Sequence, residues 1–164
     1  MRRGITGRYA VTEGVGEQVR ALYLSLYLKQ HREEYYRLLD LVRAEGDWEG
    51  WLDFLLEGVR MMADLAVTTA QRLVALFAED RARIQGGGRA AGSALRVHDL
   101  LRERPVTSLT AVSQRTGLSF PAATAGIRML AELDIARELT GRRRNRVFAY
   151  DRYLAILNEG TEPL

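Results

Sequence analysis

The sequence predicts a mainly α-helical protein whose last part holds three short helices, a small β-hairpin and a closing helix over residues 152–157. Apolar residues recur at three- and four-residue spacing through most of the chain after residue 21, which is the helical period. Near the C-terminus, two runs of strand composition flank an arginine-rich turn. With 164 residues, 47% of them apolar and 27% charged, the chain has the composition of one or two small globular domains.

The first half of the chain predicts an arm and two helices. Residues 1–21 contain several glycines and no sustained helical period, so we expect an extended arm there. An amphipathic helix is expected over residues 25–44, with Gly46 at the position beyond its end where a left-handed residue is favoured. Asp47 is placed to cap a second helix that extends to about residue 84. The β-branched run Val67-Thr68-Thr69 predicts a kink within it.

Three consecutive glycines, Gly86-Gly87-Gly88, end this helical pattern and predict a flexible Gly-rich linker over residues 86–92. A phosphate-binding loop is the alternative, but the lysine and Ser/Thr of a Walker motif are missing and no strand precedes the glycines. The expected organisation is therefore an arm over residues 1–21, a helical region over 22–85, the linker, and a second domain over 93–164.

The second domain has the element order of a winged helix-turn-helix. Helices are expected over residues 93–104, 109–116 and 120–133, with a turn at 117–119, and a hairpin is expected over 136–151. Ser108 and Ser119 are the expected N-caps of the second and third helices, and free N–H groups beside Ser108 could also meet a phosphate. In this fold the third helix enters the major groove of DNA.

The residues expected to contact DNA lie on this third helix and on the hairpin turn. The helix presents Ala122 and Ala125 together with polar and aromatic side chains near its start, and the turn carries four arginines that repel one another unless an anion is near. A solvated turn whose arginines contact nothing is the alternative. The expected DNA-contacting residues are Ser108, Ser119, Phe120, Thr124, Arg128, Arg142, Arg143, Arg144 and Arg146.

The charge distribution agrees with this division of roles. Residues 1–85 contain 12 basic and 13 acidic residues, whereas residues 86–164 contain 12 and 8, so the halves carry −1 and +4. Only Lys29 among the 24 basic residues is a lysine, which fits a GC-rich genome and is not by itself a sign of nucleic-acid binding. We expect double-stranded DNA as the partner.

Composition also argues against several other functions. The chain has no cysteine and two isolated histidines, His31 and His98, so disulfides, thiolate nucleophiles and a metal cluster are not expected. The N-terminus lacks the apolar stretch of a signal peptide, and no uncharged apolar run has the length of a membrane span. We therefore expect a cytoplasmic protein with no membrane partner, no metal and no cofactor.

Several short runs of residues, in two parts of the chain, point to a known family. They are Leu22-Tyr23-Leu24-Ser25-Leu26-Tyr27, Lys29-Gln30-His31-Arg32, Tyr35-Tyr36, Val42-Arg43, Gly46-Asp47-Trp48-Glu49, Trp51-Leu52, Thr140 to Asn145, Val147-Phe148, Tyr150-Asp151 and Tyr153-Leu154. These runs resemble bacterial Fic (filamentation-induced-by-cAMP) family proteins that carry a C-terminal winged helix, and the resemblance covers residues 22–164. Its first part is similar to the segment that follows the Fic active-site loop, and its last part to the family's C-terminal module.

The resemblance implies an ancestry without the family's chemistry. Fic enzymes typically transfer AMP from ATP to a hydroxyl side chain with a His-Pro-Phe-x-Asp-Gly-Asn-Gly-Arg motif, in which the histidine is the general base and the glycines and arginine hold phosphates. This chain lacks that motif. No catalytic residue is carried over, and neither enzymatic activity nor ATP binding is expected. The helical hairpin is then a remnant of the Fic domain.

The beginning of the chain suggests an internal deletion. Gly7-Arg8-Tyr9 and Gly16-Glu17-Gln18-Val19-Arg20-Ala21 are similar to the extreme N-terminal segment of the same family, which a large domain separates from the Leu-Tyr-Leu-Ser run in relatives. Here the two segments meet at Ala21 and Leu22. We infer that the nucleotide-binding core was removed in frame; whether it was lost in evolution or by engineering stays open.

A deletion of that kind would leave apolar helix faces without their original cover. Two helices cannot bury all of them, and exposed apolar area costs about 25 cal/mol per Å². We therefore expect a homodimer in which two hairpins form a four-helix arrangement and present two winged helices to DNA half-sites related by a dyad. The expected dimerisation residues are Trp48, Trp51, Leu55 and Leu56.

Two positions depart from the related module. Ala122 stands where related recognition helices often have threonine, and Asp134 replaces a glycine that commonly adopts a left-handed conformation after this helix. DNA affinity is therefore expected to be weaker than in intact relatives. Three hypotheses follow: a non-catalytic transcriptional regulator, which we favour; a fragment of an AMP transferase without its own active site; and a winged helix that binds protein.

Overall fold

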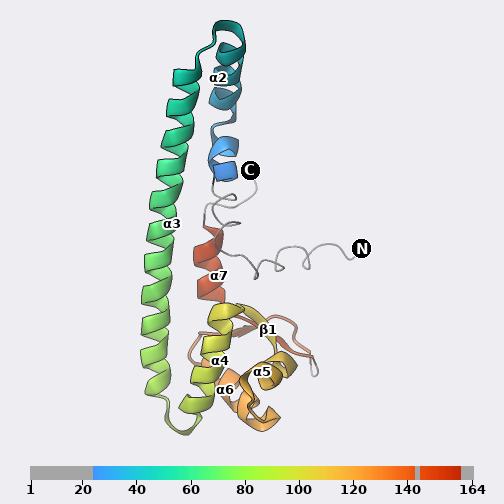
Figure 1. Ribbon diagram of the computed structural model, residues 1–164. Coiled ribbons are helices and arrows are strands. Elements are labelled where there is room, and N and C mark those ends of the chain that lie inside the picture. Colours follow the sequence, from blue (N-terminus) through green and yellow to red (C-terminus); the bar gives the residue numbers. More distant parts are fainter. Residues whose placement is uncertain (1–23, 143–144, 160–164) are drawn as a thin grey trace. The chain divides into compact units, whose positions relative to one another are not determined.

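The computed structural model describes residues 24–142 and 145–159, and these residues are mainly helical with one small antiparallel sheet (Figure 1). The chain divides into two compact units, an N-terminal unit, Glu13–Ala70, and a C-terminal unit that contains Gln71–Leu164. The long helix α3, Trp48–Gln85, contributes its first part to one unit and its last turns to the other. The boundary thus lies inside a helix, earlier than the linker expected at residues 86–92.

In the N-terminal unit, a helical segment over residues 24–30 and helix α2, Arg32–Glu45, are separated by a turn at His31, where one unbroken helix was expected. Both local signals at the following loop are confirmed. Gly46 is left-handed, with φ 72°, and its N–H donates to the Val42 carbonyl at 3.1 Å. The Asp47 carboxylate accepts from the Gly50 N–H at 3.0 Å and so caps α3.

Aromatic side chains hold this helical hairpin together. The Tyr27 ring is 5% exposed and lies 5.2 Å from the Phe54 ring, measured between centroids, and the Tyr35 and Trp51 rings are 5.4 Å apart. Gly58 allows the approach of Tyr27, because a Cβ at position 58 would lie 2.5 Å from the tyrosine ring. Helix α3 continues through residues 67–69 as α-helix, so it does not break there, and Thr68 donates its hydroxyl to the Asp64 carbonyl.

After α3, the C-terminal unit contains short helices and three short strands, and the last of its elements is a helix. In chain order the elements are η1 (Gly88–Ala90), α4 (Ala91–Glu103), β1 (Val106–Ser108), α5 (Leu109–Thr116), α6 (Phe120–Glu132), β2 (Arg137–Glu138), β3 (Val147–Ala149) and α7 (Asp151–Asn158).

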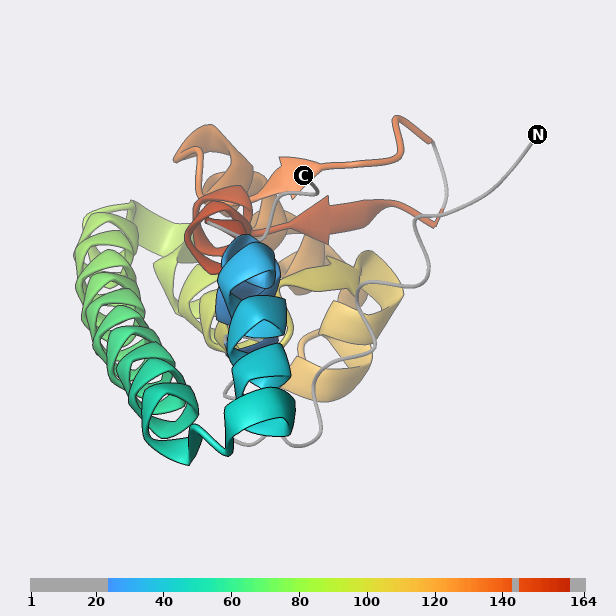
Figure 2. The same cartoon turned by 90° about the horizontal axis from the view of Figure 1, so that it is seen from above.

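The sheet is antiparallel with the strand order β1-β3-β2 (Figure 2). Strands β2 and β3 form the expected hairpin, slightly shorter than their composition suggested, with Arg137 paired to Ala149. Strand β1 was not predicted, because its residues 106–108 were interpreted only as the entry to the next helix. Its pairing of Thr107 with Phe148 joins residues far apart in the sequence and closes the sheet beside the helices.

Helices α4 and α6 make the closest helix contact of the unit, and glycine permits it. A Cβ at Gly126 of α6 would lie 3.0 Å from the backbone of Ser93 in α4, so any larger residue would push the two helices apart. Around this contact the fully buried side chains of Val97, Leu101 and Leu130 form the centre of the core. Helix α6 is thereby held with one face buried in the core and the opposite face exposed to solvent.

The glycine-rich segment packs against the edge of this core at Gly87. The methyl end of the Met129 side chain lies against Gly87, where a Cβ would be only 1.6 Å away, and η1 contacts both α4 and α6. Gly88 adopts a left-handed conformation with φ 73°. Residues 86–92 therefore belong to the C-terminal unit, although most of them are exposed, and two of the glycines have local reasons: close contact with Met129 at Gly87 and a positive φ at Gly88.

Asp134 ends helix α6 in the left-handed conformation expected for the glycine that it replaces, with φ 54°. Its N–H donates to the Ala131 carbonyl at 3.1 Å, and the Ile135 N–H donates to the Leu130 carbonyl at 2.8 Å. These two bonds make a Schellman motif, whose left-handed position prefers glycine. Ile135 and Leu130 are both buried in the core, so the strained residue is held in place by packing on either side.

We predict that Asp134→Gly stabilises the protein by about 0.5–1 kcal/mol, because glycine adopts a positive φ without steric cost while gaining some freedom in the unfolded chain. Urea unfolding measures the change. Asp134→Ala is the matched control, since it removes the same charge from the C-terminal end of α6 but keeps the backbone strain. An equal gain in both variants would assign the effect to charge instead of conformation.

Candidate nucleic-acid interface

Helices α5 and α6 and the turn between them are defined by local hydrogen bonds. The Ser108 hydroxyl caps α5 by accepting from the Ala111 N–H at 3.2 Å. Gly117 ends α5 with φ 67°, and the Ser113 hydroxyl donates to the Leu118 carbonyl at 2.8 Å, which fixes the turn. The Ser119 hydroxyl then accepts from the Ala122 N–H at 3.4 Å and starts α6. Both serines hold the cap positions expected from the sequence.

The solvent-facing side of α6 carries three of the predicted contact residues. Phe120 at its first position is 55% exposed, although it is a large apolar side chain. Arg128 is also exposed, and its only ion pair in the described part of the chain is with Glu132, at 3.6 Å on the same helix. Thr124 is half-buried and donates its hydroxyl to the Phe120 carbonyl at 2.8 Å, so its methyl group is the part left for a contact.

The hairpin loop brings further charge to this unit. Arg142 is exposed, after Gly141 with φ 59°, and Asn145 has φ 54°. Two predicted contact residues, Arg143 and Arg144, lie outside the described residues. The two ends of the loop are joined by a hydrogen bond in which the Thr140 hydroxyl accepts from the Val147 N–H at 3.4 Å.

Arg146 differs from the free cation that the sequence suggested. Its guanidinium donates to the Glu138 carboxylate at 2.5 Å and lies over the Phe148 ring, 5.1 Å from the centroid. The same hydrogen bond lowers the pKa of Glu138 below its ordinary range. The side chain is 41% exposed, so some of it still meets solvent. Arg146 thus links the two strands of the hairpin, and its charge is already balanced by Glu138.

Behind this surface the sequence reasoning missed a buried polar cluster centred on Asp80. The Asp80 carboxylate is fully buried and accepts from the Tyr150 hydroxyl at 2.6 Å, from Arg83 at 2.9 Å and from Arg152 at 3.0 Å. Arg83 also donates to the Leu133 carbonyl at 2.5 Å, at the end of α6. A single acidic residue in a charged helix gave no sequence signal, because two of its three donors, Tyr150 and Arg152, lie about 70 residues further along the chain.

His98 completes this cluster as a core residue, in agreement with the expectation of an ordinary helix histidine. Its Nε2 lies 3.4 Å from the Tyr150 hydroxyl oxygen. Since that hydroxyl donates to Asp80, it accepts from the Nε2–H, and the buried Nδ1 has no hydrogen-bond partner among the described residues. Burial is the main cause that lowers the pKa of His98, while Asp80 and Asp99 oppose it. Burial likewise raises the pKa of Tyr150 far above its usual value.

The four predicted dimerisation residues fall on two different faces of α3. Trp48 and Leu56 are each 62% exposed. Trp51 and Leu55 are half-buried, and the Trp51 ring contacts Tyr35 and Phe54 in the hairpin. The wide apolar face seen in the sequence is therefore divided between an inner face, which packs in the N-terminal unit, and an outer one.

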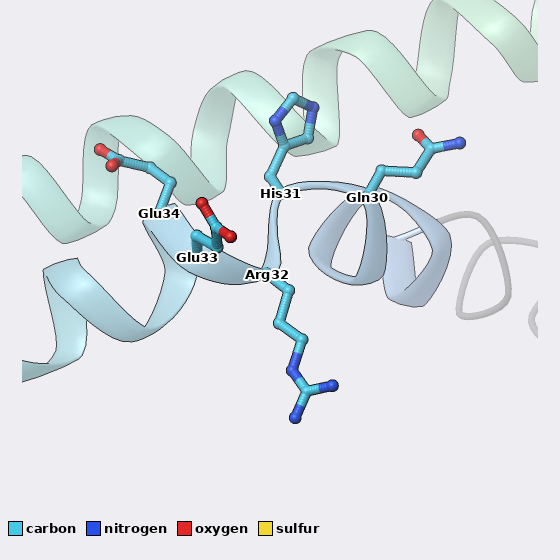
Figure 3. Close-up of a pocket in the computed structure, with 5 residues that line it drawn as sticks. All are labelled: Gln30, His31, Arg32, Glu33 and Glu34. Carbon is cyan, nitrogen blue, oxygen red and sulfur yellow. The ribbon is translucent and has the colours of Figure 1, made fainter. Parts of the chain in front are cut away.

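A shallow polar pocket lies at the break between residues 24–30 and α2 (Figure 3). It is lined by Gln30, His31, Arg32, Glu33 and Glu34. The His31 ring is 4.4 Å from Tyr27 and the Arg32 side chain points away from it in Figure 3, so the charged groups do not converge on one point. Among residues 24–142 and 145–159, no three histidine or acidic side chains are grouped to hold a metal.

No protein-family model matches the chain. Within the part of the chain that the structure describes, α3 is the one helix long and apolar enough to cross a membrane, judged by length and composition alone. Its last turns bury Leu76, Asp80 and Ile84 inside the C-terminal unit. The described residues of the C-terminal unit offer capped helices and exposed cations.

We predict that the free energy of unfolding falls as the pH drops from 7.5 to 5.5. His98 has a lowered pKa in the folded state, so below its ordinary value of about 6.5 the unfolded chain binds a proton that the folded chain does not, and stability is lost. Denaturant unfolding at several pH values measures this slope. His98→Gln should flatten it, whatever its effect on stability at pH 7.5; an unchanged slope would show that other groups cause it.

Proposed function

We propose that the protein is a non-catalytic DNA-binding regulator, and that its C-terminal unit is a winged helix-turn-helix. The observation that supports this best is the surface of α6. A helix capped by Ser119 is packed through Gly126 against α4, while Phe120 and Arg128 on its other face are exposed. An aromatic at the first position of a well-anchored helix, with an arginine two turns further along it, suits contact with base edges in a major groove.

The element order supports the same proposal. Helix α4, strand β1, helices α5 and α6, and the hairpin β2-β3 follow each other as in winged helices, with β1 completing a three-stranded sheet. In such an arrangement the hairpin loop with Arg142, Arg143 and Arg144 would contact the phosphate backbone. Arg146 is left out of the strongest contacts, because it is paired with Glu138.

We also propose that the protein derives from the Fic family and has lost that family's chemistry. The resemblance of residues 22–164 and the absence of the His-Pro-Phe-x-Asp-Gly-Asn-Gly-Arg motif support this. The alternative is a fragment of an AMP transferase that acts only with a missing core. Salt-dependent binding to duplex DNA separates the two, because it is expected of the regulator and not of an inactive enzyme fragment. Incubation with labelled ATP and a cell extract tests the loss of catalysis, because label transfer that requires the chain would overturn the non-catalytic proposal.

We predict that replacing Arg142, Arg143 and Arg144 together by alanine weakens binding to duplex DNA and lowers its salt dependence. Each phosphate contact adds about 0.9 to the slope of log K against log salt, so the slope should fall by up to about 2.7. Fluorescence anisotropy with a random-sequence duplex at several salt concentrations measures this.

The matched control replaces Arg32, Arg37 and Arg43 of α2 by alanine, which removes the same charge from the other unit. This variant should keep the salt slope. Equal losses in both variants would mean that total charge alone drives binding. A wild-type protein that does not bind duplex DNA at low salt would overturn the proposed function.

We predict that Phe120 reads a thymine methyl group, since an exposed aromatic at this position offers apolar contact in the major groove. Selection from a random duplex pool should give a site whose affinity falls about tenfold with Phe120→Ala, in line with the burial of one aromatic side chain. Replacing the contacted thymine by uracil should produce a similar loss with wild type and none with Phe120→Ala. Leu139→Ala, which alters the exposed apolar residue of the hairpin, is the control and should retain the preference.

A further inference from the structure

The outer face of α3 in the N-terminal unit carries a continuous row of exposed apolar residues. The large members are 48–62% exposed, and the alanines between them are exposed as well. We name this row the α3 stripe, and it consists of Trp48, Leu52, Leu56, Val59, Ala63, Val67 and Ala70.

The spacing of the α3 stripe is that of a helix-pairing surface. Its members follow at intervals of four, four, three, four, four and three residues, which is an eleven-residue repeat. This repeat has about 3.67 residues per turn, close to the 3.6 of a straight helix, so the stripe stays on one side of α3. Scattered surface apolar residues would not keep this register over the whole length from Trp48 to Ala70.

Side-chain size along the stripe indicates which kind of partner fits it. The large residues Trp48, Leu52 and Leu56 lie in its first half, and the small residues Ala63, Val67 and Ala70 lie in its second half. A second copy that runs in the opposite direction, centred on Val59, would place large against small along the contact: Trp48 against Ala70, Leu52 against Val67 and Leu56 against Ala63. A parallel copy would set tryptophan against tryptophan and leave a gap at the alanines.

Charge favours the same arrangement. In one chain Arg60 is paired with Glu57 at 2.6 Å and with Asp64 at 3.6 Å, and all three are exposed beside the stripe. Antiparallel pairing about Val59 brings Arg60 of each helix level with Glu57 of the other, whereas parallel pairing sets like charges at the same level.

These features fit protein better than lipid. The stripe is flanked by Asp53, Glu57, Arg60 and Asp64, whose burial in a bilayer would be costly, and the last turns of α3 are already part of the core of the C-terminal unit.

We propose that the protein forms an antiparallel homodimer through the α3 stripe. The proposed residue set differs from the one expected from the sequence, since Trp51 and Leu55 are half-buried whereas Leu52, Val59 and Val67 are exposed. The inference rests on the N-terminal unit alone and does not require the protein to bind DNA. If both proposals hold, two identical DNA-binding units belong to one closed dimer.

Sedimentation equilibrium of the whole chain tests the association. The chain mass is 18.5 kDa, and we expect twice that mass at micromolar concentration. Leu56→Glu and Val59→Glu should each weaken the dimer more than tenfold. Met61→Glu is the matched control, because Met61 is 43% exposed but lies off the stripe, and it should leave the dimer intact. A monomeric wild type would overturn the inference.

Cysteine crosslinking tests the direction, since the sequence contains no cysteine. In the antiparallel dimer, a mixture of Trp48→Cys and Ala70→Cys chains should form a disulfide-linked pair under mild oxidation. Trp48→Cys alone should not, because its two copies would lie about 33 Å apart at about 1.5 Å per residue. Efficient crosslinking of Trp48→Cys alone would show a parallel pair and contradict the proposal.

Two further outcomes are distinguishable from these. Flotation of the wild type with phosphatidylcholine and phosphatidylglycerol vesicles, combined with a monomeric mass in their absence, would assign the stripe to a membrane and overturn the dimer. A stable dimer that does not bind duplex DNA would support the dimer and count against the proposed function. A monomer that binds DNA would do the reverse.

Discussion

The buried carboxylate of Asp80 is the constraint on which the C-terminal unit depends. A charged group without water is tolerated only when several donors replace its hydration, and here the hydroxyl of Tyr150 and the guanidinium groups of Arg83 and Arg152 do so. These donors come from α3, from the end of β3 and from α7. The three elements must therefore close together, and the last turns of α3 become part of the unit instead of leading away from it.

The structure divides the arginines into two groups that cannot be told apart in the sequence: those paired with carboxylates inside the unit and those exposed to solvent. Arg83 and Arg152 neutralise Asp80, and Arg146 pairs with Glu138, so these guanidinium groups hold elements of the unit together. Arg128 and Arg142 remain exposed on the face of α6 and on the hairpin loop. Arginine abundance by itself thus says little about nucleic acid, and the proposed DNA contact depends on the arginines left facing solvent.

Three parts of helix α3 have different surroundings. Its inner face packs aromatic residues against the preceding helix, its last turns bury Leu76, Asp80 and Ile84, and its outer face carries the α3 stripe. An apolar surface this wide cannot be satisfied by one neighbouring helix. In the sequence the faces merge into a single broad pattern, which explains why Trp51 and Trp48 were assigned one role although only Trp48 is largely exposed.

The sequence alone determined the local features. Ser108, Ser119 and Asp47 cap helices, and Gly46, Gly117 and Asp134 end them with positive φ, because each of these interactions joins residues a few positions apart. Tertiary structure alone decided that strand β1 forms, that Asp80 is buried with Tyr150, that Arg146 is held by Glu138, and that Gly87 is packed against Met129. All four depend on partners from other elements, and a periodic pattern carries no information about which distant residue will fill a given space.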